Sequence, residues 1–260
     1  MDEGKKLYCA EMASRYGSDV LLEKYPEQTE NIIDCFSYSE NKITKCVFVS
    51  NEGNPKVIAT VSFDSTFDTR TATIDKLERD FTANEKNLFT IKKSAIEEIN
   101  SGIIYVTYKN TSLHFIPLIS GFTKKVFVIT VPNKNGVVYF GNDYLFTFDS
   151  YNILKSKKLL HKFITAIDYS GNASFENKGG ISAMHSHSAV DGEIITSTDI
   201  CIIMLNEKVA RWVSHLIVAD NKVCVWSCDT NTLAVMSKNA FAKMSERPEK
   251  RKNRTNLIYN

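Results

Sequence analysis

Hydrophobic and polar positions alternate in three similar blocks, which recur about every 55 residues. Each block has the pattern of a short apolar strand, a basic amphipathic helix, and further strands joined by tight turns. The blocks begin at Leu88, Leu145 and Ile200. Repetition at a fixed period indicates copies of one supersecondary unit. We therefore expect an α+β fold in which helices cover one face of antiparallel sheets.

The blocks predict individual elements, and the region before them follows a weaker pattern. Residues 1–40 have the weakest hydrophobic pattern, and a helix is predicted over 26–38. The remaining predicted strands are 42–50, 56–63, 69–74, 88–91, 103–108, 112–118, 126–131, 144–148, 173–177, 181–190, 193–196, 200–205, 222–228 and 232–237, and the helices are 92–100, 151–167 and 207–219.

This pattern divides the chain into two similar halves. We expect an N-terminal domain over 1–118, a connector over 119–143, a C-terminal domain over 144–237 and a basic, mobile tail over 238–260. Each domain would hold two strand–helix–strand–strand repeats.

The two predicted C-terminal helices share an arrangement of positive charge. In 151–167, Lys155, Lys158 and Lys162 follow the i, i+3, i+7 spacing away from the apolar stripe, and Lys208 and Arg211 stand similarly in 207–219. If the blocks are related by rotation, these cations line one surface. Such a surface would attract a polyanion through its phosphates, without reading bases.

Composition restricts the class of protein. The apolar fraction is 43 %, the charged fraction is 24 % and the net charge is +2, which is typical of a soluble globular chain. Six cysteines are scattered without zinc-ribbon spacing, and no apolar leader stands at the N-terminus. We expect reduced thiols and an intracellular setting, cytoplasmic or nuclear. No apolar stretch is long enough to span a bilayer, so no membrane partner is expected.

Three long segments carry a resemblance to a known family. They are LFTIKKSAIEEINSGIIYVTYKNTSLHFIPL, YLFTFDSYNILKSKKLLHKFITAIDYSGNASFENKGGISAMHSHSAV and ICIIMLNEKVARWVSHLIVADNKVCVWSCDTNTLAVMSK. Together they resemble the DNA sliding clamps, which include the proliferating cell nuclear antigen and the two-domain clamps of phages and DNA viruses. The resemblance covers 88–237 well and 20–87 poorly.

The resemblance implies a ring-shaped polymerase processivity factor, not an enzyme, without catalytic residues, metal or cofactor. Two-domain protomers would close head-to-tail into a homotrimer around double-stranded DNA, by pairing of edge strand 111–118 with a strand near 190–196 of the next protomer. The connector would lie beside an apolar pocket for peptides of the DNA polymerase and clamp loader. DNA-binding residues would be Lys155, Lys158, Lys162, Lys208, Arg211, Lys92 and Lys93.

Some residues depart from the clamp pattern. Acidic residues accompany both predicted helices of the N-terminal half, which is therefore less basic than a clamp lining. The basic tail is also not typical, although its end, 256–259, could dock on a partner.

Three other interpretations stay open. A clamp-fold protein that forms no ring could serve a virus as a processivity subunit or late transcription factor. A viral cyclic-dinucleotide nuclease would use Tyr151 and Lys155, but no histidine precedes His114 to complete its triad. His185 and His187 alternate along one strand and share a face, a spacing that could bind a metal, yet no third ligand is evident nearby in the sequence.

Overall fold

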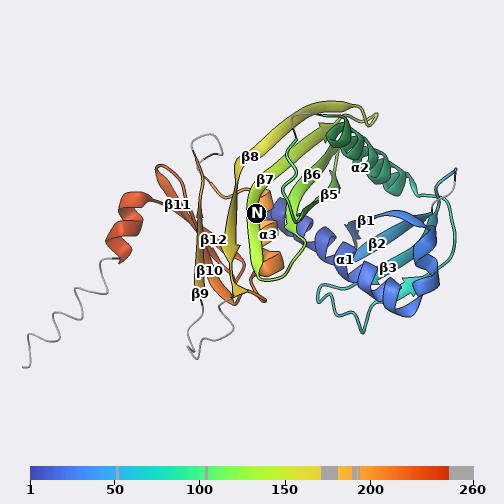
Figure 1. The fold of residues 1–260 in the computed structure, drawn as a ribbon, viewed down its shortest axis with the longest axis horizontal. Helices are drawn as coiled ribbons and strands as arrows, with labels where there is room; N and C mark the ends of the chain where they lie inside the picture. The colour runs from blue at the N-terminus through green and yellow to red at the C-terminus, as the bar shows by residue number, and fades with distance from the viewer. Residues whose placement is uncertain (51–52, 103–104, 171–180, 189–191, 193, 246–260) are drawn as a thin grey trace, which may run out of the picture.

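The protein has an α+β fold with three four-stranded sheets, as a computed structural model shows (Figure 1). The structure describes residues 1–50, 53–102, 105–170, 181–188, 192 and 194–245. The predicted strand 173–177 and the end of the tail, 246–260, lie outside these residues. The three sheets follow one another across the molecule, with the sheet of β5–β8 in the middle (Figure 1). The predicted fold class, α+β, is confirmed.

The first unit is a long helix on a small antiparallel sheet. Helix α1 (Asp2–Lys24) and the short 3₁₀ helix η1 (Pro26–Asn31) precede β1 (Ile32–Glu40), β2 (Ile43–Ser50), β3 (Val57–Phe63) and β4 (Thr73–Asp75), in the order β1-β2-β3-β4. The predicted helix 26–38 is wrong. Its apolar residues belong to β1, which pairs with β2 across a tight turn at Asn41 and Lys42, both with positive φ.

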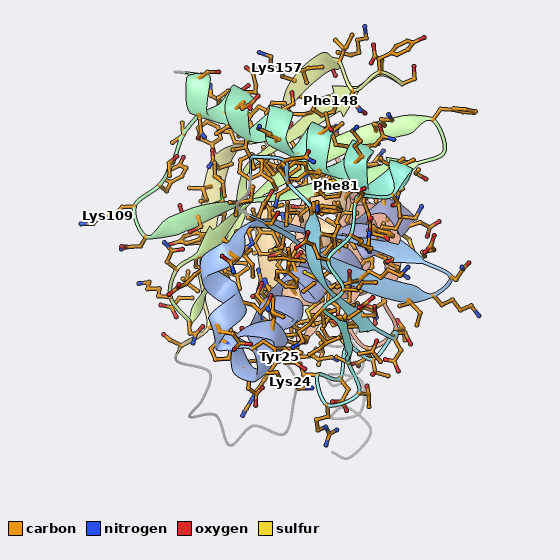
Figure 2. The ribbon with its side chains drawn as sticks, turned by 90° about the vertical axis from the view of Figure 1, so that its right-hand side faces the viewer. Lys24, Tyr25, Phe81, Lys109, Phe148 and Lys157 are labelled. Atoms are coloured by element: carbon orange, nitrogen blue, oxygen red, sulfur yellow. The ribbon has the colours of Figure 1, made fainter. Side chains whose placement is uncertain are left out.

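The second unit repeats this plan. Helix α2 (Ala83–Ser101) precedes β5 (Thr111–Ser120), β6 (Thr123–Pro132), β7 (Val137–Phe148) and β8 (Leu154–Asp168), in the order β5-β6-β7-β8. Thr82 and Glu85 form a reciprocal cap that begins α2. The helix packs on the sheet face that carries Phe148, and Figure 2 shows Phe148 and Lys157 beside it.

Several predictions fail in this unit. Residues 88–91 lie inside α2, although the helix over 92–100 and its end before Gly102 are confirmed. Residues 105–108 form no strand. The predicted helix 151–167 is wrong, because β8 pairs with β7 along nearly its whole length. Residues 118 and 143, after which domain boundaries are expected, lie within β5 and β7, and the division into domains stays a prediction.

The third unit crosses over through a buried helix. Strand β9 (Ile181–Ser186) leads through α3 (Ser197–Asn206) to β10 (Trp212–Val218), which lies parallel to β9; β11 (Lys222–Ser227) and β12 (Thr232–Ser237) complete the order β12-β11-β10-β9. The predicted strand 200–205 and helix 207–219 are therefore both wrong. The predictions for 222–228 and 232–237 are confirmed. Residues 238–245 are helical.

Two central helices connect the units. The N-terminal part of α1 packs against α3 and the middle sheet, through a cluster that includes Leu7, Ile129 and Cys201. Within the described residues, no helix has the length and apolar character needed to cross a membrane. All six cysteines are free.

Candidate metal centre

Four of the five histidines of the chain gather between the middle sheet and the third sheet. His161 belongs to β8, the edge strand of the middle sheet, and His185 belongs to β9, the edge strand of the third. His187 follows β9, and His215 belongs to β10. The fifth, His114, lies elsewhere, paired with Glu11.

Local structure explains why these side chains point inward. The alternation of β9 buries Ala183 and His185 and exposes Met184 between them, and His187 continues the buried row. His161 on β8 lies where the pairing with β7 is irregular, because the register shifts twice between Gly141 and Tyr144. Bulges of this kind redirect side chains near functional sites.

Asp199 completes the cluster from the first turn of α3. Its Oδ2 atom accepts hydrogen bonds from the backbone N–H of Thr196 at 2.8 Å and from the hydroxyl of Thr196 at 2.7 Å, as part of a reciprocal helix cap. The cap fixes the carboxylate, whose Oδ2 atom also faces His187 and His161, while Oδ1 faces His185. Asp199 thus both starts the helix and presents a candidate ligand atom.

Four separations between donor atoms are close to those around a tetrahedral ion. His187 Nε2 is 3.2 Å from Asp199 Oδ2 and 3.2 Å from His185 Nε2. His185 Nε2 is 3.4 Å from Asp199 Oδ1, and His161 Nε2 is 3.7 Å from Asp199 Oδ2. Ligands about 2.0–2.1 Å from a tetrahedral ion lie roughly 3.3–3.4 Å apart.

Among the described residues, His161, His187 and Asp199 form the group whose ligand atoms could hold a metal, all within 4.8 Å of one another. His185 lies beside this group. We refer to His161, His185, His187 and Asp199 as the His–Asp cluster. Two imidazoles and a carboxylate on an ordered scaffold are a typical ligand set for Zn²⁺.

Electrostatics also favour a cation at this place. Burial raises the pKa of the Asp199 carboxyl, but hydrogen bonds from His185 and His187 and the charge of His161 hold this pKa well below its usual range. Asp199 and the neighbouring Asp143 are each 1 % exposed. In the part of the chain that the structure describes, the ion pairs of both carboxylates are with histidines alone. Buried charges of this kind need a compensating partner.

Hydrogen bonds outside the cluster orient two of its imidazoles. His161 Nδ1 lies 2.7 Å from Asp143 Oδ1, and His185 Nδ1 lies 2.8 Å from His215 Nε2. Burial, and then the charge of His185, lowers the pKa of His215 to about 3, so His215 is neutral near pH 7. The ring of His185 also stacks on Phe140, with a centroid distance of 4.3 Å.

The cluster forms part of the wall of a cavity of about 190 Å³. Aromatic rings of Phe140 and Phe163 and the hydroxyl residues Thr165, Ser186 and Ser188 line the rest of it, with Gly141. No lysine or arginine is among the described residues of this lining. A substrate could therefore approach the cluster, and a neutral group would fit there better than a phosphate.

The structure places the predicted DNA-binding residues on three separate elements. Lys155, Lys158 and Lys162 are exposed on β8, and Lys208 and Arg211 lie in the turn between α3 and β10. On α2, Lys93 is exposed, whereas Lys92 is largely buried and pairs with Asp34 at 2.5 Å. The common helical face on which the DNA-binding prediction rested is not formed, because 151–167 and 207–219 contain strands.

The sequence analysis named two residues of the candidate metal centre but expected no metal site. The spacing of His185 and His187 was recognised, but His161 and Asp199 were assigned no role. The Thr196–Asp199 cap could have located the start of α3, which brings a carboxylate next to the strand with the two histidines. Comparisons of the chain with protein-family models, with curated proteins and with solved structures gave no match.

Proposed function

We propose that the protein is a metal-dependent hydrolase whose ion is held by the His–Asp cluster. The observation that carries this proposal is the convergence of His161, His187 and Asp199, whose ligand atoms lie within 4.8 Å of one another on a cavity wall, with His185 beside them. Zn²⁺ is the ion that such nitrogen and oxygen ligands favour. His161, His187 and Asp199 would form the inner set, and His185, whose Nε2 atom lies 3.2 Å from that of His187, would complete it.

A bound Zn²⁺ ion would supply an activated water, whose pKa falls to about 7 in such sites. The cavity gives this water room on one side of the cluster. Because its described lining carries no lysine or arginine, it would admit a neutral carbonyl compound, an amide or an ester, in preference to a phosphate ester. The buried ring of Phe140 would give the cavity an apolar wall beside the reacting group.

Metal binding is the first test. Metal-stripped protein titrated with Zn²⁺ in a calorimeter should bind one equivalent, and His187→Ala should lose most of the affinity. His114→Ala is the matched control, since this histidine lies outside the cluster and pairs with Glu11. Wild-type protein that binds no Zn²⁺, or variants that bind alike, would contradict the proposal.

Hydrolysis is the second test. Zn²⁺-loaded protein is incubated with chromogenic amides, carboxylic esters and phosphate esters. Turnover of an amide or ester that disappears in His187→Ala and persists in His114→Ala supports the reaction class. Turnover confined to phosphate esters would contradict the assignment of the cavity.

The sliding-clamp hypothesis stays a prediction. It would require two similar clamp domains, a homotrimeric ring around DNA, and contacts with polymerase and clamp-loader peptides. Its strongest support, a shared basic helical face, is gone, and an exposed basic strand, β8, remains. Light scattering after size-exclusion chromatography tests it, because a ring requires a trimer.

A further inference from the structure

Asp143 occupies a position where three elements meet. It lies in β7 and is fully buried, and its carboxylate reaches both β8 and α3. The Oδ1 atom accepts the backbone N–H of His161 at 3.1 Å and lies 2.7 Å from Nδ1 of the same residue. The Oδ2 atom accepts the hydroxyl of Thr198, the residue directly before Asp199.

These contacts determine which ring nitrogen of His161 faces the cluster. A carboxylate only accepts hydrogen bonds, so Nδ1 of His161 must carry the proton that it shares with Asp143. Nε2 then presents its lone pair on the other side, where Asp199 Oδ2 lies 3.7 Å away. Without Asp143, the ring could rotate or exchange its proton between the two nitrogens.

The geometry points to Asp143 as a positioning residue of the metal centre, with Thr198 holding Asp143 in place. Resting on the proposed metal centre, this inference adds the residues that make His161 a ligand. A carboxylate behind an imidazole orients the ring and makes its free nitrogen a stronger donor to a metal. Thr198 links this support to the helix that carries Asp199, so both ligands move together.

His185 has a different support and serves as an internal comparison. Its Nδ1 atom lies 2.8 Å from His215 Nε2, so its partner is an imidazole and not a carboxylate. An imidazole partner adds no negative charge. Loss of Asp143 should therefore weaken metal binding through His161 and leave the contribution of His185 unchanged.

A purely structural role for Asp143 makes a different prediction. Asp143 also ties β7 to β8 and α3, so replacement by alanine could simply destabilise the fold. Asp143→Asn avoids this ambiguity, because the amide keeps the shape and its oxygen can still accept a hydrogen bond. Thr198→Val removes the hydroxyl at nearly constant volume, whereas Thr198→Ser retains it.

The experiment titrates the metal-free full-length chain with Co²⁺ and follows the visible d–d absorption, which reports ligand number and geometry. Wild type and Thr198→Ser should give the same spectrum and affinity. Asp143→Asn and Thr198→Val should bind 10- to 100-fold more weakly, about the loss seen when such partners are removed, with an altered spectrum. Asp168→Asn, an exposed carboxylate at the end of β8, is the control.

The outcomes separate the two proposals. A wild type that binds no Co²⁺ overturns the metal centre and, with it, the role of Asp143. A wild type that binds Co²⁺, with Asp143→Asn matching it in affinity and spectrum, overturns the positioning role alone. The thermal midpoints of the metal-free variants are measured in parallel, and a loss of affinity and spectrum with an unchanged midpoint excludes a merely structural effect.

Discussion

Gly141→Ala tests whether the irregular pairing of β7 and β8 builds the metal centre. Gly141 has a φ of +96°, and a Cβ atom there would lie 1.9 Å from the carbonyl oxygen of Phe163. Because real Cβ atoms do not approach other atoms closer than 3.0 Å, Phe163 on β8 would have to move by roughly 1 Å. His161 lies two residues before Phe163 on the same strand.

The expected loss of stability has two parts. Placing alanine at such a φ costs about 1–3 kcal/mol. Displacement of β8 weakens neighbouring ladder hydrogen bonds, at about 0.5–1.5 kcal/mol each. We therefore expect Gly141→Ala to lower the free energy of unfolding by about 2–5 kcal/mol, and to weaken Zn²⁺ binding as His161 moves.

Gly121→Ala is the matched control for this variant. Gly121, in the turn between β5 and β6, also has a positive φ, +59°, but a Cβ atom there would meet nothing within 4 Å. Its cost should be backbone strain alone, about 1–2 kcal/mol. Urea unfolding of both variants and of wild type measures the difference. Equal losses, or unchanged Zn²⁺ affinity in Gly141→Ala, would refute the reasoning.

Three further predictions concern charge. Glu85 accepts hydrogen bonds from both Nη groups of Arg79, at 2.7 and 2.8 Å. Burial raises the pKa of Glu85, but these bonds outweigh burial and lower the pKa to about 2. The ionised Glu85 therefore stabilises the fold above about pH 4.5, and this stabilisation is lost as pH falls toward 2. Glu85→Gln should therefore cost about 1–3 kcal/mol at pH 7 in urea unfolding, with a smaller difference at pH 3. Burial raises the pKa of Glu207 to about 6. The contribution of Glu207 to stability is therefore fully present below about pH 4.5 and is lost as pH rises through 6. Glu207→Gln should be more stable than wild type by about 1–2 kcal/mol at pH 8 and equal to it at pH 4. Reversing the exposed Lys155, Lys158 and Lys162 to glutamate should change unfolding by less than about 1.5 kcal/mol, since exposed positions contribute within about 0.5 kcal/mol each. If β8 contacts DNA, the same variant should lose retention on a DNA column at low salt.

The strands with local turn signals were predictable from sequence. Strands β2 and β3, and likewise β11 and β12, are consecutive and antiparallel, so alternation and turn residues define them without knowledge of distant segments. Helix α2 was predicted in part, because its amphipathic pattern and its stop at Gly102 are also local.

Other elements could not be predicted from the spacing of apolar residues. Helix α3 is buried on nearly all sides, so Ile200, Ile202 and Ile203 give a continuous apolar run that matches a strand equally well. Strand β8 shows the opposite ambiguity. Two register shifts around Asp143 interrupt its two-residue alternation, and Leu160, Ile164 and Ile167 fall at helical spacing by coincidence.

These misread elements explain why the sequence analysis expected no metal site and noted only two residues of the His–Asp cluster. His185 in β9 and His187 just after it share a face wherever that segment lies. Recognition of His161 and Asp199 as their partners requires β8 to be a strand and α3 to be a helix, and then requires the packing of two sheets. Such long-range arrangement is set by tertiary contacts, which no local pattern contains.

The division of the His–Asp cluster between two sheets would link the proposed ion to the arrangement of the sheets. His161 comes from the edge of the middle sheet and the other three donors come from the third unit, and β8 and β9 form no strand pair with each other. A bound ion would hold the two edges together and so oppose their separation. By thermodynamic reciprocity, a contact that separates the edges must weaken ion binding by the same coupling free energy. A molecule wedged between β8 and β9 would therefore regulate ion occupancy without touching a ligand atom.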